Sequence, residues 1–133
     1  MKATFRKVAM AIAVFLFAAG IHAQDTTGKA ISSEKFEKRM HKRKVTVLDV
    51  RTPEEYAEGH LHHAVLINVL DSTAFVSKVQ SLKKNRTYLI YCKSGRRSGK
   101  ALVMMQQQGF RKLYQLDGGI TAWKGPVEKT EEP

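Results

Sequence analysis

Short apolar runs alternate along this chain with longer segments in which apolar residues return every three or four positions. The runs are rich in β-branched and aromatic residues, and they predict strands at residues 45–50, 64–69, 87–91 and 112–117. The segments around them carry helix caps and one apolar face, and they predict helices at residues 32–43, 52–59, 72–82 and 97–108, with a short helix from residue 118. Because helices separate the strands, we expect a single α/β domain: a parallel sheet of four or five strands with helices on both faces.

The first residues do not belong to this pattern. Three basic residues precede an apolar stretch at residues 8–19, and a small-residue segment ends at Ala23. This is the pattern of a secretory signal peptide that is cleaved after Ala23. The alternative is a membrane anchor, but the apolar stretch is shorter than the roughly 20 residues that span a bilayer. We expect a signal peptide at residues 1–23, a flexible leader at 24–31, a folded domain at 32–126 and a disordered tail at 127–133.

The net charge of the chain and its predicted compartment limit the kinds of partner that we expect. Removing the predicted signal peptide leaves 20 basic residues (23 minus 3) against 12 acidic ones, a net charge of +8. Such a balance favours anionic partners. Nucleic acid is not expected, since we predict export to a bacterial periplasm, without stable membrane association after cleavage. The densest basic cluster, at residues 34–44, is interpreted as the solvated face of an amphipathic helix.

The chain has one cysteine, Cys92, between the apolar run "TYLIY" and a stretch of glycines and cations, "KSGRRSGK". A single cysteine forms no internal disulfide, so it pairs with another chain, packs as an inert residue or reacts as a free thiol. The start of the following helix directs N–H groups and a positive dipole end at the sulfur, and three cations follow within five residues. Both effects favour the thiolate. Gly95 allows successive N–H groups to converge into an anion nest, so the segment predicts a nucleophilic thiolate in a cradle for oxyanions.

Three motifs resemble those of single-domain rhodaneses (thiosulfate sulfurtransferases). The segment "CKSGRRS" resembles their Cys-x-x-Gly-x-Arg active-site loop, "VLDVRTPEEYAEGHL" their Asp-Val-Arg segment, and "LDGGITAW" their Gly-Gly…Trp ending. The motifs stand in family order from Val47 to Trp123, and with the signal peptide the chain is similar to the exported, phage-shock-type members. One departure is "GHLHHAV", where His62 and His63 stand in place of the usual Pro-Gly pair, so this turn must close without a glycine.

The resemblance implies a rhodanese-like fold and a two-step reaction without a cofactor. Cys92 takes the outer sulfur of thiosulfate as a persulfide, and a thiol or cyanide acceptor then removes it. By similarity, the backbone N–H groups of the loop hold the transferred sulfur and the oxygens of the small anionic donor. The implied substrate-binding residues are those that follow the nucleophile: Lys93, Ser94, Gly95, Arg96 and Arg97. Within this set the resemblance gives cationic stabilisation to Lys93 and Arg97.

Other polar residues near the predicted site receive structural interpretations. Asp49, Arg51 and Glu55 lie at a strand end and on a short helix, where an ion pair can fasten the loop beyond the strand. His60, His62 and His63 suggest a metal site, but adjacent ligands rarely converge on one ion, so no metal is expected.

Two rival functions remain open at this point. Cysteine phosphatases and arsenate reductases use a similar cradle but resemble Cys-x5-Arg, whereas here four residues separate Cys92 from Arg97 and Ser98 stands at the next position. The second rival is a persulfide carrier or sulfide-binding module without significant turnover, which needs the same cysteine. The oligomeric state is not indicated by the sequence.

Overall fold

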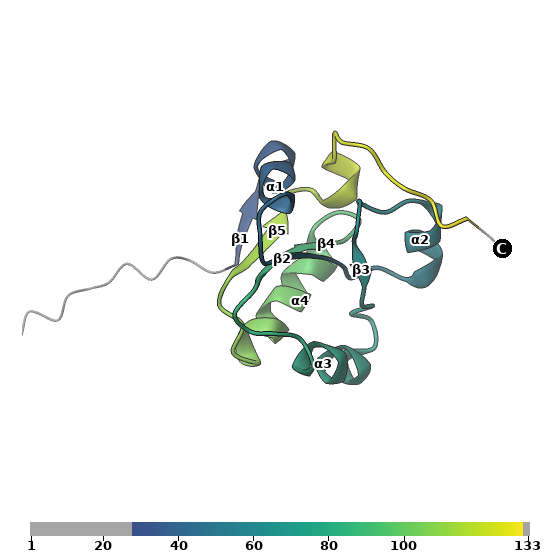
Figure 1. Cartoon of the computed structure of the whole chain (residues 1–133). Coiled ribbons are helices and arrows are strands. Elements are labelled where there is room, and N and C mark those ends of the chain that lie inside the picture. Colours follow the sequence, from purple (N-terminus) through teal and green to yellow (C-terminus); the bar gives the residue numbers. More distant parts are fainter. Residues whose placement is uncertain (1–27, 132–133) are drawn as a thin grey trace, which may run out of the picture.

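The computed structural model describes residues 28–131 and contains one five-stranded sheet with helices on both sides (Figure 1). The strands are β1 (Lys29–Ile31), β2 (Val45–Asp49), β3 (Val65–Leu66), β4 (Thr87–Tyr91) and β5 (Leu113–Leu116). The helices are α1 (Ser33–Met40), α2 (Pro53–Glu58), α3 (Ser72–Gln80), α4 (Arg96–Gln107) and the 3₁₀ helix η1 (Gly119–Ala122). The strand order is β1-β5-β4-β2-β3, and every neighbouring pair is parallel. This confirms the predicted α/β fold and fixes the number of strands at five.

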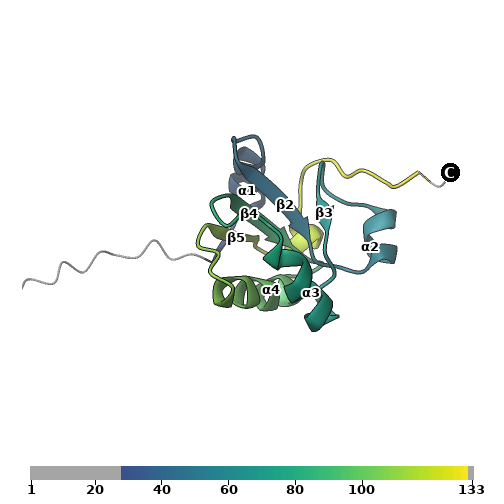
Figure 2. The same cartoon turned by 60° about the horizontal axis from the view of Figure 1, so that its bottom comes forward.

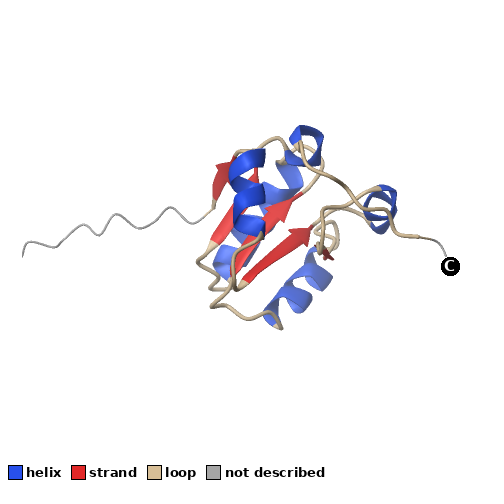
Figure 3. Cartoon of the chain, turned by 45° about the horizontal axis from the view of Figure 1, so that its top comes forward, coloured by secondary structure: helices blue, strands red, loops and turns tan. Residues whose placement is uncertain are grey.

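The sheet separates two apolar cores, and β4 contributes to both. Ile90 and Cys92 face the core beneath α3 and α4, whereas Leu89 and Tyr91 face the core beneath α1 and η1. This alternation follows from the two-residue period of a strand. Figures 2 and 3 show the two helical layers on either side of the strands. Cys92 is thus placed on the α4 face at the end of the central strand.

The predicted leader and tail need correction. The last leader residues, Lys29–Ile31, form β1 and pair with β5 at the edge of the sheet. This strand has three residues, and only Ile31 is buried. It is therefore too short to show the alternation of buried and exposed residues from which a strand can be predicted. The tail also has fixed contacts: Glu128 exchanges two backbone hydrogen bonds of 2.8 Å with His60, and Figure 1 shows the tail running beside α2. The predicted signal peptide and residues 24–27 lie outside the described residues.

The segment between α2 and β3 departs from its predicted extent. β3 has two residues rather than the predicted six, and it begins directly after the turn at His62 and His63. That turn closes with His63 at φ 58°, a left-handed conformation that glycine adopts without strain and other residues adopt at a cost. His63 therefore adopts a left-handed conformation at the position where the motif that the chain resembles has glycine.

No helix among residues 28–131 combines the length and the apolar character that crossing a bilayer requires.

Candidate active site

The end of β4 and the start of α4 are joined by a tight loop that begins at Cys92. The two strands that flank β4, β2 and β5, end at the same edge of the sheet, as expected for a site in an open parallel sheet. Gly95 caps α4 at φ 106°, a conformation that favours glycine. This turn bends the loop so that the amide of Gly95 points back toward the cysteine.

The Cys92 thiol lies at the centre of this loop and is 1% exposed. The backbone N–H of Gly95 donates to Sγ at 3.0 Å, and the Ser98 hydroxyl oxygen lies 3.4 Å from Sγ. Burial raises the pKa of Cys92, but hydrogen bonds from the Ser98 hydroxyl and from the amides of Ser98, Gly95 and Ser94 outweigh it and lower the pKa below its usual value. The loop thus supplies the amide nest that favours a thiolate.

Arg97 does not offer a free charge to a ligand. Its guanidinium donates to both carboxylate oxygens of Glu55, at 2.7 and 2.8 Å. The hydrogen bond from Arg97 is the main reason that the pKa of Glu55 falls to about 2, even though partial burial acts in the opposite direction. Glu55 also completes the capping box of α2 with Thr52. The pair therefore connects α2 to the start of α4 and neutralises Arg97. This differs from the resemblance, which gives Arg97 a role in cationic stabilisation of the substrate.

The remaining loop side chains are exposed. Lys93, Ser94 and Arg96 all have exposed side chains, and Lys93 lines a cavity of about 230 Å³ together with Glu55 and Glu58. Since Arg97 is neutralised, the exposed cations of the loop are Lys93 and Arg96, and of these Lys93 directly follows the nucleophile.

The 3₁₀ helix η1, which Gly118 caps and which begins at Gly119, holds the backbone of the cysteine loop in place. The amides of Ile120 and Thr121 in η1 donate to the carbonyls of Cys92 and Lys93, at 2.9 and 3.1 Å. Gly119 adopts φ 62°, and a Cβ atom there would lie 2.4 Å from the Lys93 carbonyl oxygen. The Gly-Gly sequence is required because only glycine permits both this conformation and this close approach. With its carbonyls bound to η1, the loop has its amides directed toward the sulfur.

Asp49 and Arg51 form a buried ion pair beside the loop. Asp49 is fully buried and accepts from the Arg51 guanidinium at 2.7 Å and from the Tyr91 hydroxyl at 2.6 Å. Arg51 also donates to the Gly59 carbonyl at 2.6 Å, and the Tyr91 hydroxyl accepts from the Leu61 amide at 3.1 Å. Burial, followed by the nearby Asp49 carboxylate, raises the pKa of Tyr91 and keeps it protonated. The network fastens the chain after α2 to β2 and β4, while Glu55 lies outside it.

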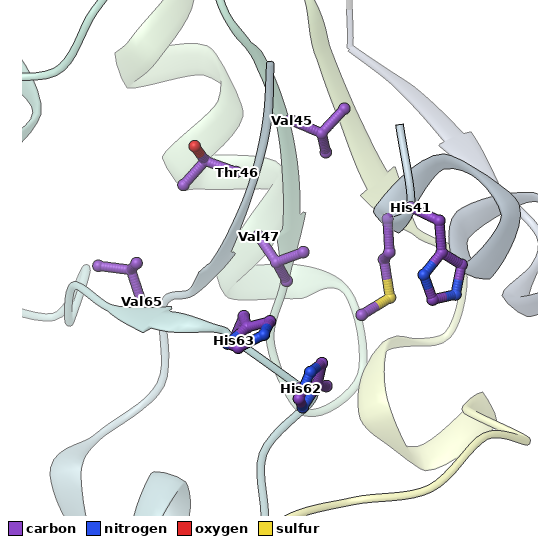
Figure 4. A pocket seen from close by; sticks show the side chains of 8 residues that line it. His41, Val45, Thr46, Val47, His62, His63 and Val65 are labelled. Carbon is purple, nitrogen blue, oxygen red and sulfur yellow. The ribbon is translucent and has the colours of Figure 1, made fainter. Parts of the chain in front are cut away.

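The histidines lie apart from the thiol loop. His60 stacks on Tyr56 with ring centroids 3.8 Å apart, and His62 pairs with Glu128 of the tail. His62 and His63 also line a cavity of about 500 Å³ that His41 borders from the other side, as Figure 4 shows. Among residues 28–131, no group of three or more His, Cys, Asp or Glu side chains is arranged to hold a metal ion.

Sequence reasoning missed two residues near the thiol, Ser98 and Gln115. Ser98 is fully buried in the first turn of α4, and its hydroxyl lies 2.9 Å from Oε1 of Gln115 on β5. Gln115 shares a strand face with Leu113, which is buried beneath α4. A polar residue on an inward-facing position of a predicted strand is the signal that could have identified it.

Comparison with known proteins places the chain in a family. A family model described as "Rhodanese-like domain" matches residues 32–126. The relatives include proteins named tRNA uridine(34) hydroxylase from Pelagibacter ubique, 33% identical over 101 residues (76% of this chain and 34% of the relative), and from Cytophaga hutchinsonii, 35% identical over 96 residues (71% and 31%). The chain thus spans about a third of the length of these curated relatives.

Solved structures agree with the family model. A rhodanese-like domain protein from Staphylococcus aureus superposes with a TM-score of 0.67 at 28% identity, covering 77% of this chain and 99% of that one. A rhodanese-like domain from Anabaena gives a TM-score of 0.67 at 26% identity, covering 76% and 79%. Together with the five-stranded parallel sheet and the cysteine loop, these matches establish that the chain belongs to the rhodanese-like domain family.

Proposed function

We propose that this protein is a thiosulfate sulfurtransferase that carries sulfur as a persulfide on Cys92. The observation that carries the proposal is the environment of the thiol: Sγ is buried, it accepts from the Gly95 amide at 3.0 Å, and its pKa is lowered by hydrogen bonds from Ser98, Gly95 and Ser94 in spite of burial. A thiolate is the nucleophilic form of cysteine. Amides that converge on it also stabilise the charge of a persulfide.

The proposed reaction has two displacement steps and needs no external oxidant or reductant. In the first step, the Cys92 thiolate attacks the outer sulfur of thiosulfate; a new S–S bond forms, and the bond to the sulfite sulfur breaks with its electron pair leaving on sulfite. In the second step, cyanide or a thiolate attacks the outer sulfur of the persulfide. Cys92 leaves as the thiolate, so the enzyme returns to its starting charge state.

The charges around the loop support a small dianionic donor. Thiosulfate carries two negative charges, and the exposed Lys93 ammonium follows the nucleophile directly. Arg97 contributes less than its position in the motif implies, because Glu55 neutralises it. Lys93 is therefore proposed as the principal cation for the donor. The amides of Ser94, Gly95 and Ser98 donate to Sγ of Cys92, and we propose that they also stabilise the persulfide formed there.

The relatives are named for hydroxylation of a tRNA uridine, and the match covers about a third of their length. We do not carry that activity to this chain, since our proposal rests on the thiol loop. We further propose export to a bacterial periplasm, as in the phage-shock-type members, on the basis of the N-terminal sequence pattern. In that compartment the partners would be a small anionic donor and a thiol acceptor rather than nucleic acid.

Two observations weaken the case for a cysteine phosphatase. The position that bears arginine in Cys-x5-Arg enzymes is Ser98, which is fully buried. The arginine one residue earlier is bound to Glu55. A persulfide carrier without turnover would use the same thiol environment, and only kinetics separate it from an enzyme.

Steady-state transfer of sulfur from thiosulfate to cyanide, measured as thiocyanate, tests the proposal. We expect multiple turnovers per protein molecule, complete loss of activity in Cys92→Ala, and wild-type activity in Ser81→Ala, a surface control at the end of α3. A single turnover would favour the carrier, and retained activity in Cys92→Ala would refute the proposed nucleophile.

A further inference from the structure

Among the described residues, Sγ of Cys92 has one side-chain hydrogen-bond partner, the hydroxyl of Ser98. Its oxygen lies 3.4 Å from Sγ, 2.9 Å from Oε1 of Gln115 and 3.1 Å from the Gly95 carbonyl oxygen. Ser98 is fully buried, so water does not compete freely for these contacts. The hydroxyl is thus held between a nucleophile and a side-chain amide from the neighbouring strand.

The hydroxyl has one proton and faces three acceptors. A neutral thiol donates its own proton to the Ser98 oxygen, and the serine proton then goes to Oε1 of Gln115 or to the Gly95 carbonyl. A thiolate reverses this need, because Sγ then has no proton and accepts. The serine proton must turn toward the sulfur, which leaves the serine oxygen free to accept from another group.

Gln115 is suited to supply that second donor. A side-chain amide presents an oxygen at one end and an N–H₂ group at the other, so rotation by half a turn replaces the acceptor facing Ser98 with a donor. Gln115 stands opposite Ile90 in the register of β5 and β4, on the strand next to the one that leads into Cys92. The two amide orientations therefore match the two charge states of the sulfur.

We propose that Gln115 and Ser98 form a hydrogen-bond relay, Gln115 N–H to Ser98 O–H to Cys92 S⁻, that stabilises the charged sulfur. The benefit of the relay to the enzyme rests on the proposed function. In that reaction Sγ is negatively charged before the first displacement and after the second, whereas in the persulfide the charge lies on the outer sulfur. Ser98 acts on the reacting sulfur directly. Gln115 is a positioning residue that acts through Ser98.

The relay has a rival in a purely structural role for Ser98. A serine in the first turn of a helix commonly bonds a nearby carbonyl, as Ser98 does with Gly95. In that case its removal would change the stability of the domain, but it would not change the pH dependence of the thiol. The two roles are separated by measuring the thiol itself.

The test is the rate of alkylation of Cys92 by iodoacetamide between pH 5 and 10, without any sulfur donor. The variants are Ser98→Ala, Gln115→Met and Gln115→Glu, with Ser98→Thr as the conservative rescue. A hydrogen bond to a charged group is strong enough to change the thiolate fraction at pH 6 by about tenfold or more. The greater intrinsic reactivity of a more basic thiolate offsets part of this. We expect Ser98→Ala to react roughly three- to tenfold more slowly at pH 6, and its plateau at high pH to lie roughly threefold or more above that of wild type, because its thiolate is more basic.

The expected order within the series is specific to a relay. Gln115→Glu should be slowed at least as much as Gln115→Met, because a carboxylate accepts a hydrogen bond and cannot donate one, whereas Ser98→Thr should stay within about twofold of wild type. The charged groups around the thiol are unchanged in the serine variants: Arg97 with its partner Glu55, and the exposed Lys93 and Arg96.

Matched controls come from the surface. Ser81→Ala removes a hydroxyl that donates to a helix carbonyl, and Gln80→Met removes an exposed amide that donates to Gln108; neither should alter the profile. Superimposable wild-type and Ser98→Ala profiles would overturn the relay, and a slowed Ser98→Ala with normal Gln115 variants would exclude Gln115 from it. Because no donor is present, these outcomes are independent of whether thiosulfate is the substrate.

Discussion

The ion pair between Glu55 and Arg97 can be tested by removing its charge while keeping its shape. Glu55→Gln leaves a side-chain carbonyl that can still accept from the Thr52 amide in the capping box of α2, as Glu55 does at 3.0 Å. What is lost is the charge opposite Arg97, whose guanidinium lies 2.7 and 2.8 Å from the two carboxylate oxygens. The substitution therefore isolates the electrostatic link between α2 and α4.

The size of the effect follows from the pKa of Glu55. A fall from 4.5 to about 2 corresponds to about 3 kcal/mol of unfolding free energy at most, since one pKa unit is about 1.4 kcal/mol. The two side chains are 23% and 27% exposed, so solvent screens part of this interaction. We expect Glu55→Gln to lower the free energy of unfolding by about 1–2 kcal/mol at pH 7 and Tm by about 5–15 °C.

The pH dependence gives the sign of the effect. The pKa of Glu55 is lower in the folded than in the unfolded protein, so its stabilisation is fully present above about pH 4.5 and is lost as the pH falls through about 2. By pH 3 more than half of the difference between wild type and Glu55→Gln should have disappeared. Urea unfolding at pH 7, 5 and 3, followed by the fluorescence of Trp123, the single tryptophan, measures this directly.

Glu34→Gln is the matched control. Glu34 pairs with Lys38 at 3.2 Å, but the two side chains are 78% and 73% exposed, so this loss should stay below about 0.5 kcal/mol. Equal losses in the two variants, or a Glu55→Gln loss that does not change with pH, would refute the reasoning.

Three further predictions, one of them with a control substitution, concern other parts of the molecule. Gly119→Ala should lower the free energy of unfolding by about 3 kcal/mol or more and abolish sulfur transfer, because its Cβ would lie 2.4 Å from the Lys93 carbonyl oxygen. A Cβ at Gly99, in the interior of α4, would meet nothing closer than 3.8 Å, so the control Gly99→Ala should raise the free energy of unfolding by up to about 1 kcal/mol. Thermal melts measure both changes, and a Gly119→Ala protein as stable as wild type would contradict the close approach. His63→Gly should raise the free energy of unfolding by about 0.5–1 kcal/mol, because it relieves the left-handed conformation at φ 58°; a loss in urea unfolding would show that contacts of the histidine ring outweigh the strain. Lys93→Ala should lower kcat/KM for thiosulfate by roughly ten- to a hundredfold, and it should lower kcat/KM for singly charged mercaptopyruvate by less. Equal losses for the two donors would contradict a selective role of Lys93.

Local patterns were sufficient to predict most of the elements. β2 and β4 were predicted because both are buried on two faces and therefore have near-continuous apolar sequences. α2 was predicted from a proline and acids in its first turn, and the structure adds the full capping box. β1 was missed because a three-residue edge strand has too few positions to show a period, and it forms only through pairing with β5 at the far end of the chain.

The site was predicted less completely than the fold. The loop could be located because a lone cysteine, a glycine and several cations follow a strand within a few residues. The partner of Arg97 could not, since Glu55 lies 42 residues away and becomes a neighbour only when α2 packs against the start of α4. The same is true of Gln115, which lies on β5 and contacts Ser98 in the first turn of α4, 17 residues away in the sequence. Contacts of this kind depend on the tertiary fold and leave no periodic signal.

The central claim is that Cys92 forms a persulfide with sulfur taken from thiosulfate. The most direct measurement is the intact mass of the reduced protein after incubation with thiosulfate and removal of the excess. We expect the addition of one sulfur atom, located at Cys92 by peptide mapping, lost again on treatment with cyanide and absent from Cys92→Ser. An unchanged mass in the folded wild-type protein, or the same addition in Cys92→Ser, would contradict it.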